Sequence, residues 1–380
     1  MTRDALSAEE ILRKVHSIGD YYGFIPFASL AARHKGSGRP SHSSEMPLLP
    51  PLDPTAESIA VFLKQCVDAG LMPSPRQPLF VWHSNITPGR NAPRVAQIQF
   101  HAIGTDRALA DAVVIHAMRA LARDLMKSDY VIRINTLGDK ETRARFAREL
   151  GNFFKKNSAI LPEECLTCAR RDVFEAAELA IERRFAEHLP APTDFLSDQS
   201  RKRFEELLDY LEATETPYEL APDLLSRSGG WGEACFALTH EDKTLVWGSR
   251  YGELARLFFK SAMPAVGAVL KTETEGAKVF PVKRRARLRF AFVHIGDEAK
   301  HASIKLAEEL RKARLPIWQI IGLESLTEQM YHVERLNPPY LIVMGRKEAL
   351  EHSVVLRNRA TQEDVAIPIE HLTERLRSVA

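Results

Sequence analysis

The first apolar positions of the chain recur at the spacing of a helix. Those between Ile11 and Tyr22 fall on one helical face, which predicts an amphipathic helix with a buried apolar side. Ser7 and Glu10 stand three residues apart just before this run, the pattern of a capping box, and Gly23 marks its end. We therefore expect a capped helix at the start of the chain.

Up to about residue 277, helical and strand-like patterns follow one another irregularly. Expected helices cover 56–66, 106–126, 139–156 and 197–213, and the Gly-, Ser- and Pro-rich residues 34–55 are expected to form a loop. Expected strands cover 79–83, 95–104, 130–135 and 264–272, together with a hairpin that turns at Glu241 and Asp242. This pattern predicts an α+β domain with an antiparallel sheet.

The last hundred residues follow a different pattern. Three short, continuous apolar runs, LRFAFVHI, PIWQII and YLIVM, are separated by helical patterns near 302–314 and 325–336. Such alternation indicates βαβ units and a largely parallel sheet. We therefore expect a first domain over 1–277, a linker over 278–287 and an α/β domain over 288–380.

The expected linker region is strongly basic. The segment KVFPVKRRARLRF (278–290) contains no acidic residue. Two interpretations stay open, because basic runs are common: a solvated linker, or a hinge that contacts the phosphates of a nucleic acid. The candidates for phosphate contact are Lys283, Arg284, Arg285 and Arg287.

Composition narrows the class of protein. The 380 residues include 52 basic and 50 acidic side chains and are 45% hydrophobic, which excludes a disordered, fibrous or disulfide-built protein. Four cysteines, no apolar signal core and no apolar run of membrane-spanning length favour a cytoplasmic protein. The formal net charge of +2 argues against a dedicated nucleic-acid binder, but this sum hides the basic segment.

Five segments match one known family in their order along the chain. They are INTLGD (135–140), residues 194–225, WGSRYGELARLF (247–258), MPAVGAVL (263–270) and residues 325–372. Together they resemble histidyl-tRNA synthetases. In that family the segments follow the second class II motif, lead into the histidine-binding stretch, form a glycine–arginine–tyrosine turn, begin the third class II motif and build the anticodon-binding domain.

This resemblance implies a fold and an activity. The fold is an α+β class II synthetase-like antiparallel-sheet core, followed by an α/β anticodon-binding-like domain, in a homodimer with the N-terminal helix near the dimer interface. The activity joins histidine to its tRNA with ATP and Mg²⁺. Because activation brings a carboxylate against the α-phosphate of ATP, it needs fixed cations, which arginine supplies best. The family takes one arginine from each of three places: the second motif, the third motif and the histidine-binding stretch.

All three arginine positions hold other residues in this chain. Ungapped matching puts Pro88 at the second-motif position, Thr274 at the third-motif position and Ser226 at the position in the histidine-binding stretch. Arg90 and Arg227 are nearby candidate substitutes. Loss of one charge-stabilising donor typically costs about 10²–10³ in rate. We therefore expect adenylation to be weak or absent unless a shift of register brings these arginines into place.

The surroundings of Thr274 and the second motif also differ from the family. Glu273 matches the family's glutamate and is a candidate substrate-binding residue. Lys271 replaces a glycine that lets ATP approach, and Arg94 is a further arginine near the second-motif position.

A second group of residues matches the family's amino-acid pocket. Asp53 and Thr55 in LDPT (52–55) resemble the acid and threonine of the segment that holds the histidine ammonium, and Asp106 matches the family's second acid. Ala102 stands where glutamine is usual, and Tyr251 would form a lid or a wall. A structural role is equally open, because an aspartate before a helix is a common N-cap.

Cysteine and histidine offer few further sites. Cys165 and Cys168 suggest zinc, but no second pair of ligands lies at suitable spacing, so we expect no zinc and a buried corner between helix and loop. The segment from His294 to Asp297 ends the first C-terminal strand, where α/β sheets bind ligands, so anticodon contact and an ordinary turn both stay open. We expect the following to be core residues: Cys66, Cys235, His101 and His116.

Two functions follow from these expectations. The first is a synthetase-like protein that binds tRNA, and histidine or ATP, with aminoacylation weakened or lost. The alternative is an active divergent histidine–tRNA ligase that uses ATP with Mg²⁺. We expect tRNA and a second copy of the chain as partners, leave a partner protein open, and expect neither DNA nor a membrane.

Overall fold

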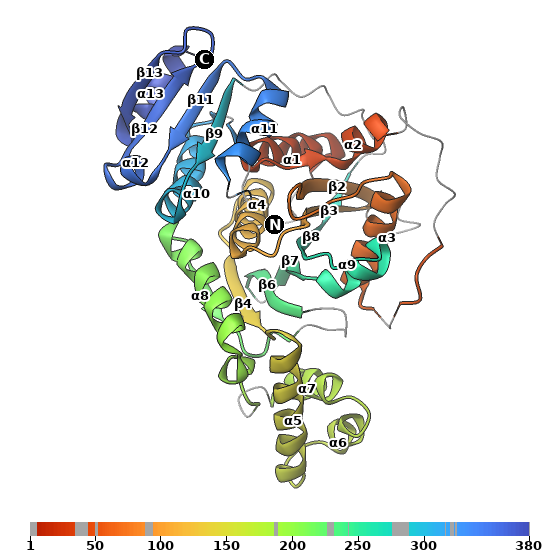
Figure 1. The fold of residues 1–380 in the computed structure, drawn as a ribbon. Coiled ribbons are helices and arrows are strands. Elements are labelled where there is room, and N and C mark those ends of the chain that lie inside the picture. The colour runs from red at the N-terminus through yellow and green to blue at the C-terminus, as the bar shows by residue number, and fades with distance from the viewer. Residues whose placement is uncertain are drawn as a thin grey trace.

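The computed structural model describes residues 6–34, 45–49, 52–87, 94–185, 189–225, 232–241, 243–275, 289–315, 317–319, 323 and 325–379. These residues form two sheets, each with its own helices (Figure 1). The expected linker 278–287 lies outside the described residues, so the domain boundaries stay predictions. The first sheet ends at Thr274 and the second begins at Phe290.

The first sheet has eight strands among the described residues, in the order β1-β2-β3-β8-β7-β6-β4-β5. Its central pairs are antiparallel, as expected, and the short edge strands β1 and β5 pair in parallel with β2 and β4. The strands are β1 Ile25–Pro26, β2 Leu79–Thr87, β3 Arg94–Ile103, β4 Val131–Thr136, β5 Tyr218–Leu220, β6 Gly232–His240, β7 Lys243–Arg250 and β8 Ala265–Thr274.

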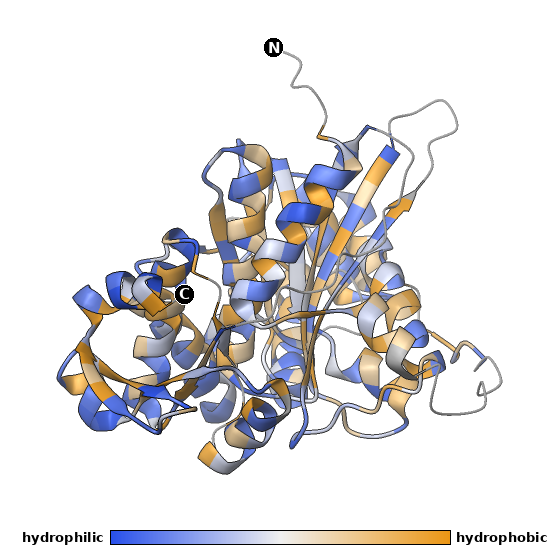
Figure 2. Cartoon of the chain, turned by 90° about the horizontal axis from the view of Figure 1, so that it is seen from above, coloured by the Kyte–Doolittle hydropathy of each residue, from blue (hydrophilic) through white to orange (hydrophobic). Residues whose placement is uncertain are grey.

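Helices pack on both faces of this sheet. One face is apolar and is covered by α1 Ala8–Tyr22, α4 Ala108–Met126 and α8 Asp198–Ala213. The other face is partly covered by α3 Pro54–Asp68 and α9 Gly252–Phe259. Hydrophilic and hydrophobic residues alternate along the strands (Figure 2), because successive side chains of a strand point to opposite faces.

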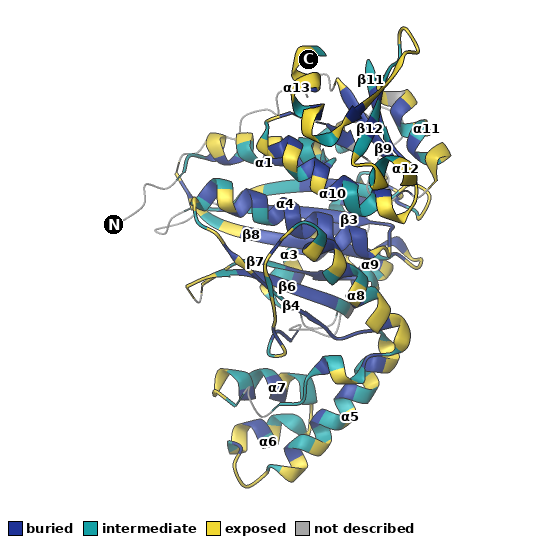
Figure 3. Cartoon of the chain, turned by 90° about the vertical axis from the view of Figure 1, so that its left-hand side faces the viewer, coloured by how far each residue is buried: buried dark blue, intermediate teal, exposed yellow. Residues whose placement is uncertain are grey.

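Three further helices form a separate cluster with its own small core. They are α5 Lys140–Lys156, α6 Glu163–Ala169 and α7 Val173–Glu182, and they stand apart from the sheets in Figure 3. Neither α6 nor α7 was expected from the sequence, nor was α2 Phe27–His34. Such short helices carry a weak periodic signal and depend on tertiary packing.

The expected first helix is confirmed in detail. Ser7 and Glu10 form both bonds of the capping box, and Gly23 ends α1 with a φ of 77°, in the left-handed region. The expected helix over 56–66 begins two residues earlier, at Pro54, because the Asp53 carboxylate caps it. A proline suits this place, since its missing N–H would have no partner in the first turn.

The second sheet has the order β10-β9-β11-β12-β13. β9, β10 and β11 are parallel, as the βαβ pattern predicted, whereas β12 and β13 are antiparallel additions. Its elements are β9 Phe290–His294, α10 Asp297–Lys312, β10 Trp318–Gln319, α11 Leu326–Leu336, β11 Tyr340–Met344, α12 Arg346–Leu350, β12 Ser353–Asn358, β13 Asp364–Pro368 and α13 Ile369–Val379.

Candidate active site on the first sheet

One face of the first sheet carries most of the candidate chemistry. Because side chains alternate along a strand, Gln97, Gln99 and His101 of β3 share this face. The register places Lys271 of β8 opposite Gln97. We call this surface the polar face, and its residues on β2, β3, β7 and β8 include His83, Gln97, Gln99, His101, Trp247, Lys271 and Glu273.

Lys271 and Glu273 lie on the polar face, two residues apart, and both are exposed. The resemblance places Lys271 at a glycine position, so an ammonium group stands here where the family has no side chain. An ammonium can pair with phosphate oxygens, and a carboxylate such as that of Glu273 is a ligand that Mg²⁺ accepts. These two groups therefore fit a nucleotide with its metal, although neither is an arginine fork.

Thr274 points away from the polar face. It is 3% exposed, and its hydroxyl donates to the carbonyl of Leu6 at 2.9 Å. The N-terminal segment encloses this end of β8, because the N–H of Ala8 donates to the carbonyl of Glu275 and the N–H of Glu275 to that of Leu6, both at 3.2 Å. The position assigned to the third-motif arginine therefore holds a buried hydroxyl on the wrong side of the strand.

Arg94 does not replace the missing cation on the polar face. It lies opposite Thr274 in the register of β3 and β8, and it shares a side of β3 with Ala96 and Ile98, which face the helices. The remaining residues of this prediction lie outside the described part of the chain, so their roles stay predictions. They are Pro88, Arg90, Ser226 and Arg227.

Tyr251 is fully buried and fits a wall of the pocket, not a lid. Its Oη lies 2.8 Å from Nδ1 of His101, and Nε2 of His101 lies 2.9 Å from Oε1 of Gln99. The His101 ring also stacks on Phe62 at 4.3 Å. Gly267 leaves the room for this arrangement, because a Cβ there would lie 2.2 Å from Nδ1 of His101.

Burial keeps both members of this pair neutral. It lowers the pKa of His101 to about 3 and raises that of Tyr251 well above its ordinary value. Since an amide oxygen only accepts, His101 donates from Nε2 to Gln99 and accepts from the Tyr251 hydroxyl at Nδ1. The expectation that His101 is a satisfied core residue is confirmed.

The predicted substrate residues are divided between the two ends of the sheet. The N–H of Tyr251 donates to the carbonyl of Ala265, at the start of β8, at 2.9 Å. Glu273 lies eight residues further along the same strand, about 26 Å away at roughly 3.3 Å per residue. Asp106 follows Ile103, which pairs with Ala265, so it belongs to the end that holds Tyr251.

Asp53 acts as a helix cap, as its structural interpretation predicted. Its Oδ1 accepts from the backbone N–H groups of Thr55 at 2.7 Å and Ala56 at 3.0 Å. This bond fixes the start of α3, which packs over the polar face. A role of Asp53 and Thr55 in holding an amino group stays a prediction.

Asp106 is exposed and does not cap the next helix, so its structural interpretation was wrong. α4 begins at Ala108, and its N-cap position is Arg107, without a side-chain cap. The carbonyl of Asp106 instead accepts from Arg203 of α8. This contact fixes the backbone beneath the Asp106 carboxylate.

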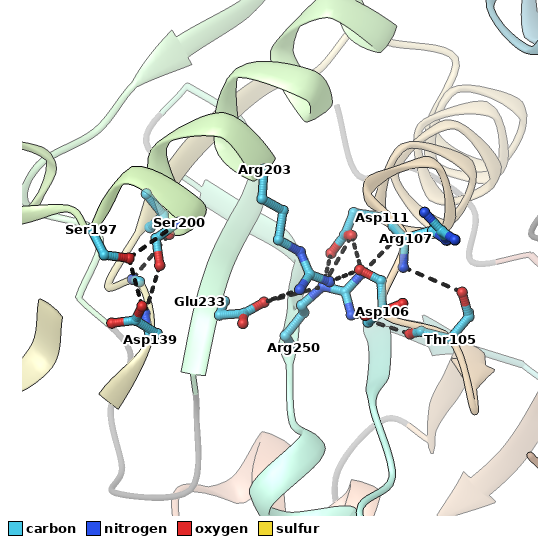
Figure 4. A network of polar contacts seen from close by, with 12 residues as sticks. Thr105, Asp106, Arg107, Asp111, Asp139, Ser197, Ser200, Arg203, Glu233 and Arg250 are labelled. Atoms are coloured by element: carbon cyan, nitrogen blue, oxygen red, sulfur yellow. Dashed lines mark hydrogen bonds and ion pairs between the residues drawn. The ribbon is translucent and has the colours of Figure 1, made fainter. Parts of the chain in front are cut away.

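A buried ion pair lies next to Asp106 (Figure 4). Arg250 and Asp111 are 4% and 2% exposed, and Nε of Arg250 lies 2.9 Å from one carboxylate oxygen. The same guanidinium donates to the carbonyls of Thr105 at 3.2 Å and Arg107 at 2.8 Å. Arg250 therefore holds the whole loop between β3 and α4, which carries Asp106.

A second ion pair joins this network to α8. Glu233 of β6 lies 2.8 Å from Arg203 and 3.8 Å from Nε of Arg250. Burial lowers the pKa of Arg203, and the nearby positive charge of Arg250 adds to this effect. Sequence patterns did not predict a role for Asp111, Arg203 or Glu233, because the three residues come from segments that only the fold brings together.

Comparison with known proteins identifies the family. The family model described as "Anticodon binding domain" matches residues 279–379. A histidine–tRNA ligase of Thermosipho melanesiensis is 26% identical over 296 residues, covering 73% of this chain and 69% of the relative. One of Caldanaerobacter subterraneus subsp. tengcongensis is 29% identical over 296 residues, covering 74% and 70%. The chain belongs to the histidyl-tRNA synthetase family.

A solved structure supports the fold of this family member. The apo histidyl-tRNA synthetase of S. aureus matches with a TM-score of 0.51 and 20% sequence identity, covering 99% of this chain and 98% of that one. The class II synthetase-like core followed by an anticodon-binding domain is therefore confirmed as the fold.

The end of β9 in the anticodon-binding domain favours a turn over a ligand contact at His294. His294 is 1% exposed, and both its ring nitrogens are buried without a hydrogen-bond partner. Burial lowers its pKa to about 4. The exposed residues that follow include Asp297, whose carboxylate pairs with Lys300 at 2.9 Å and suits an RNA phosphate poorly.

The four cysteines of this family member are free thiols. Cys165 is buried in the core of the α5–α7 cluster, on helix α6, and Cys168 is half-buried. Cys66 and Cys235 lie in the core, as expected. Over the part of the chain that the structure describes, no group of three or more metal-ligating side chains gathers.

No helix of the described residues has the length and apolar character needed to cross a membrane.

Proposed function

We propose that this member of the histidyl-tRNA synthetase family binds tRNA, with histidine activation weakened or lost. The observation that carries the proposal is Thr274. Its buried hydroxyl occupies the position of a cation that would offset charge at the α-phosphate, and it faces away from the polar face. A neutral side chain there supplies no charge to the transition state, and removal of one such donor costs about 10²–10³ in rate.

The binding part of the proposal rests on the C-terminal domain. The anticodon-binding family model covers residues 279–379, and its first residues include the basic segment with Lys283, Arg284, Arg285 and Arg287. Cations in a linker beside such a domain are suited to RNA phosphates. A cytoplasmic location, a homodimer and a partner protein belong to this proposal as expectations from the family resemblance.

The alternative is an active divergent histidine–tRNA ligase. Lys271 favours it, because its exposed ammonium lies on the polar face next to Glu273, and the two together fit ATP with Mg²⁺. Asp106 and Tyr251 favour it as well, because the network at their end of the sheet holds both in fixed positions. In this alternative Arg90 and Arg227 supply the charge that Thr274 lacks.

Histidine-dependent exchange of pyrophosphate into ATP distinguishes the two functions. We expect the purified chain to show exchange at least about a hundredfold below that of an active histidyl-tRNA synthetase assayed beside it. Exchange at the rate of the active enzyme would establish the alternative. A gel-shift assay with total tRNA completes the test, and loss of both exchange and tRNA binding would contradict both functions.

A further inference from the structure

Helix α10 of the anticodon-binding domain has two buried faces. Leu306 and Leu310 pack into the core of the second sheet. A second set of residues, spaced three or four apart, lies along another side of the same helix. We call this set the α10 stripe, and it consists of His301, Ile304, Glu308 and Arg311.

The first half of the α10 stripe packs on the helices of the first domain. The ring of His301 stacks on Tyr210 of α8, with 4.5 Å between centroids and 23° between planes. Ile304 is 2% exposed and belongs to the main hydrophobic cluster of the first sheet, not to that of the second. Figure 1 shows α10 between the second sheet and helices α4 and α8.

The second half of the stripe makes polar contacts with α1. The hydroxyl of Tyr22 donates to Oε2 of Glu308 at 2.5 Å, and Tyr22 is 3% exposed. Arg311 donates to both oxygens of the same carboxylate, at 2.9 Å and 2.6 Å. Burial acts to raise the pKa of Glu308, but the bonds from Arg311 and Tyr22 outweigh it and lower the pKa.

Glu308 is the only carboxylate among the residues that line a small cavity beneath the stripe. That cavity of about 10 Å³, room for one water, is also lined by Tyr22, His116, Arg119, Ala120, Arg123 and Arg311. Nε of Arg119 is buried and has no hydrogen-bond partner within the described residues. Of the three arginines, Arg311 is buried and pairs directly with Glu308, whereas Arg123 is exposed. Loss of the Glu308 charge therefore leaves the buried Arg311 without the carboxylate that it contacts.

We infer that the α10 stripe is a latch that holds the anticodon-binding domain against α1, α4 and α8, with Glu308 as its central charge. The apolar contact of Ile304 supplies burial, and the Tyr22–Glu308–Arg311 cluster fixes the register of α10 on the core. The domain then meets tRNA from a fixed position relative to the first sheet. This inference does not depend on whether the chain activates histidine.

Thiol labelling measures the opening of this latch. Ala120 is 5% exposed and lines the cavity, so Ala120→Cys in a Cys168→Ser background places a thiol under the latch. Adding Glu308→Gln keeps the size of the side chain and removes its charge. We expect this substitution to speed labelling of the introduced thiol by about 10- to 100-fold. This factor corresponds to the free energy of a hydrogen bond to a charged group.

Two controls keep the test decisive. Glu309→Gln removes a neighbouring exposed carboxylate of α10 and should leave the labelling rate unchanged. Cys235, buried in the first sheet, reports unfolding of the core and should also keep its rate.

An unchanged rate for the introduced thiol in Glu308→Gln would overturn the latch. If Cys235 became reactive to the same degree, the charge would support the whole fold and the latch would equally be rejected. Tyr22→Phe gives an independent reading, since it removes one donor to Glu308 without altering charge, and we expect a smaller rise in the same direction. No rise in this variant would contradict the role of the cluster.

Discussion

A threonine in place of an arginine changes what the end of β8 can do. The sequence alone predicted the loss of charge at Thr274, because this needs only an alignment. It could not predict that the side chain is buried under Leu6, since that contact joins residues 268 positions apart. Similarly, the spacing predicted a cap at Asp53 correctly and one at Asp106 wrongly, because α4 begins at Ala108 and its N-cap position is therefore Arg107.

Restoring the arginine should therefore fail. We expect Thr274→Arg to leave pyrophosphate exchange unchanged and to lower the free energy of unfolding by about 2 kcal/mol or more, since a charge enters a buried site without a partner. Glu273→Arg, at the neighbouring exposed position, should alter stability by about 0.5 kcal/mol or less. Urea unfolding and the exchange assay measure both. A large gain of exchange in Thr274→Arg would show that the position reaches the substrate.

A buried histidine sets part of the pH dependence of stability. Burial lowers the pKa of His116 to about 4. Because the unfolded chain takes up a proton near pH 6.5, this contribution is complete above pH 6.5 and is lost as the pH falls toward 4. We expect His116 alone to lower the free energy of unfolding by about 1.4 kcal/mol between pH 7.5 and pH 5.5.

Urea unfolding at pH 7.5 and pH 5.5 measures this loss. In His116→Gln, the fall in the free energy of unfolding between the two pH values should be smaller by this amount. His371→Gln, at an exposed position, should unfold like the parent chain at both pH values. An equal pH dependence in all three proteins would contradict the assignment to His116.

At the scale of elements, a buried ion pair joins β7 to α4. The strands of both sheets and the long helices could be predicted from periodicity, whereas α6, α7 and the edge strands β1 and β5 were missed. The missed elements are short, so their formation depends on neighbours that the local sequence does not reveal. The Arg250–Asp111 pair could not be predicted from local sequence either, because its partners lie 139 positions apart.

Breaking this pair should cost far more than breaking an exposed one. We expect Asp111→Asn to lower the free energy of unfolding by about 3–5 kcal/mol, because Arg250 is left buried without its counter-charge. The exposed pair of Arg256 and Glu253 provides the control, and Glu253→Gln should cost about 0.5 kcal/mol or less. Thermal and urea unfolding measure both variants. Similar losses would show that the Arg250 guanidinium keeps other sufficient partners.

For the whole molecule, the net charge conceals a strongly basic segment. The formal net charge of +2 pointed away from nucleic acid, yet the anticodon-binding family model matches residues 279–379, which include most of the basic segment. Both domains and their order could be predicted from the sequence. The packing of α10 on the first domain could not, because its stripe of His301, Ile304, Glu308 and Arg311 has the pattern of any amphipathic helix.

Replacing Lys283, Arg284, Arg285 and Arg287 together by alanine tests the basic hinge. We expect weaker tRNA binding. The slope of log affinity against log salt concentration should be shallower by about 3, because binding releases fewer counterions when these phosphate contacts are lost. Filter binding between low and moderate salt measures the slope. A quadruple variant with unchanged affinity and slope would show that the segment is only a linker.

Under the proposed function, this family member binds tRNA but activates histidine poorly or not at all. Single-turnover formation of histidyl-adenylate, with the chain in excess over labelled ATP, tests it most directly because slow chemistry still accumulates product. We predict adenylate formation at least about a hundredfold slower than in an active histidyl-tRNA synthetase under the same conditions. Adenylate formed at the rate of the active enzyme, and only with histidine present, would contradict the account.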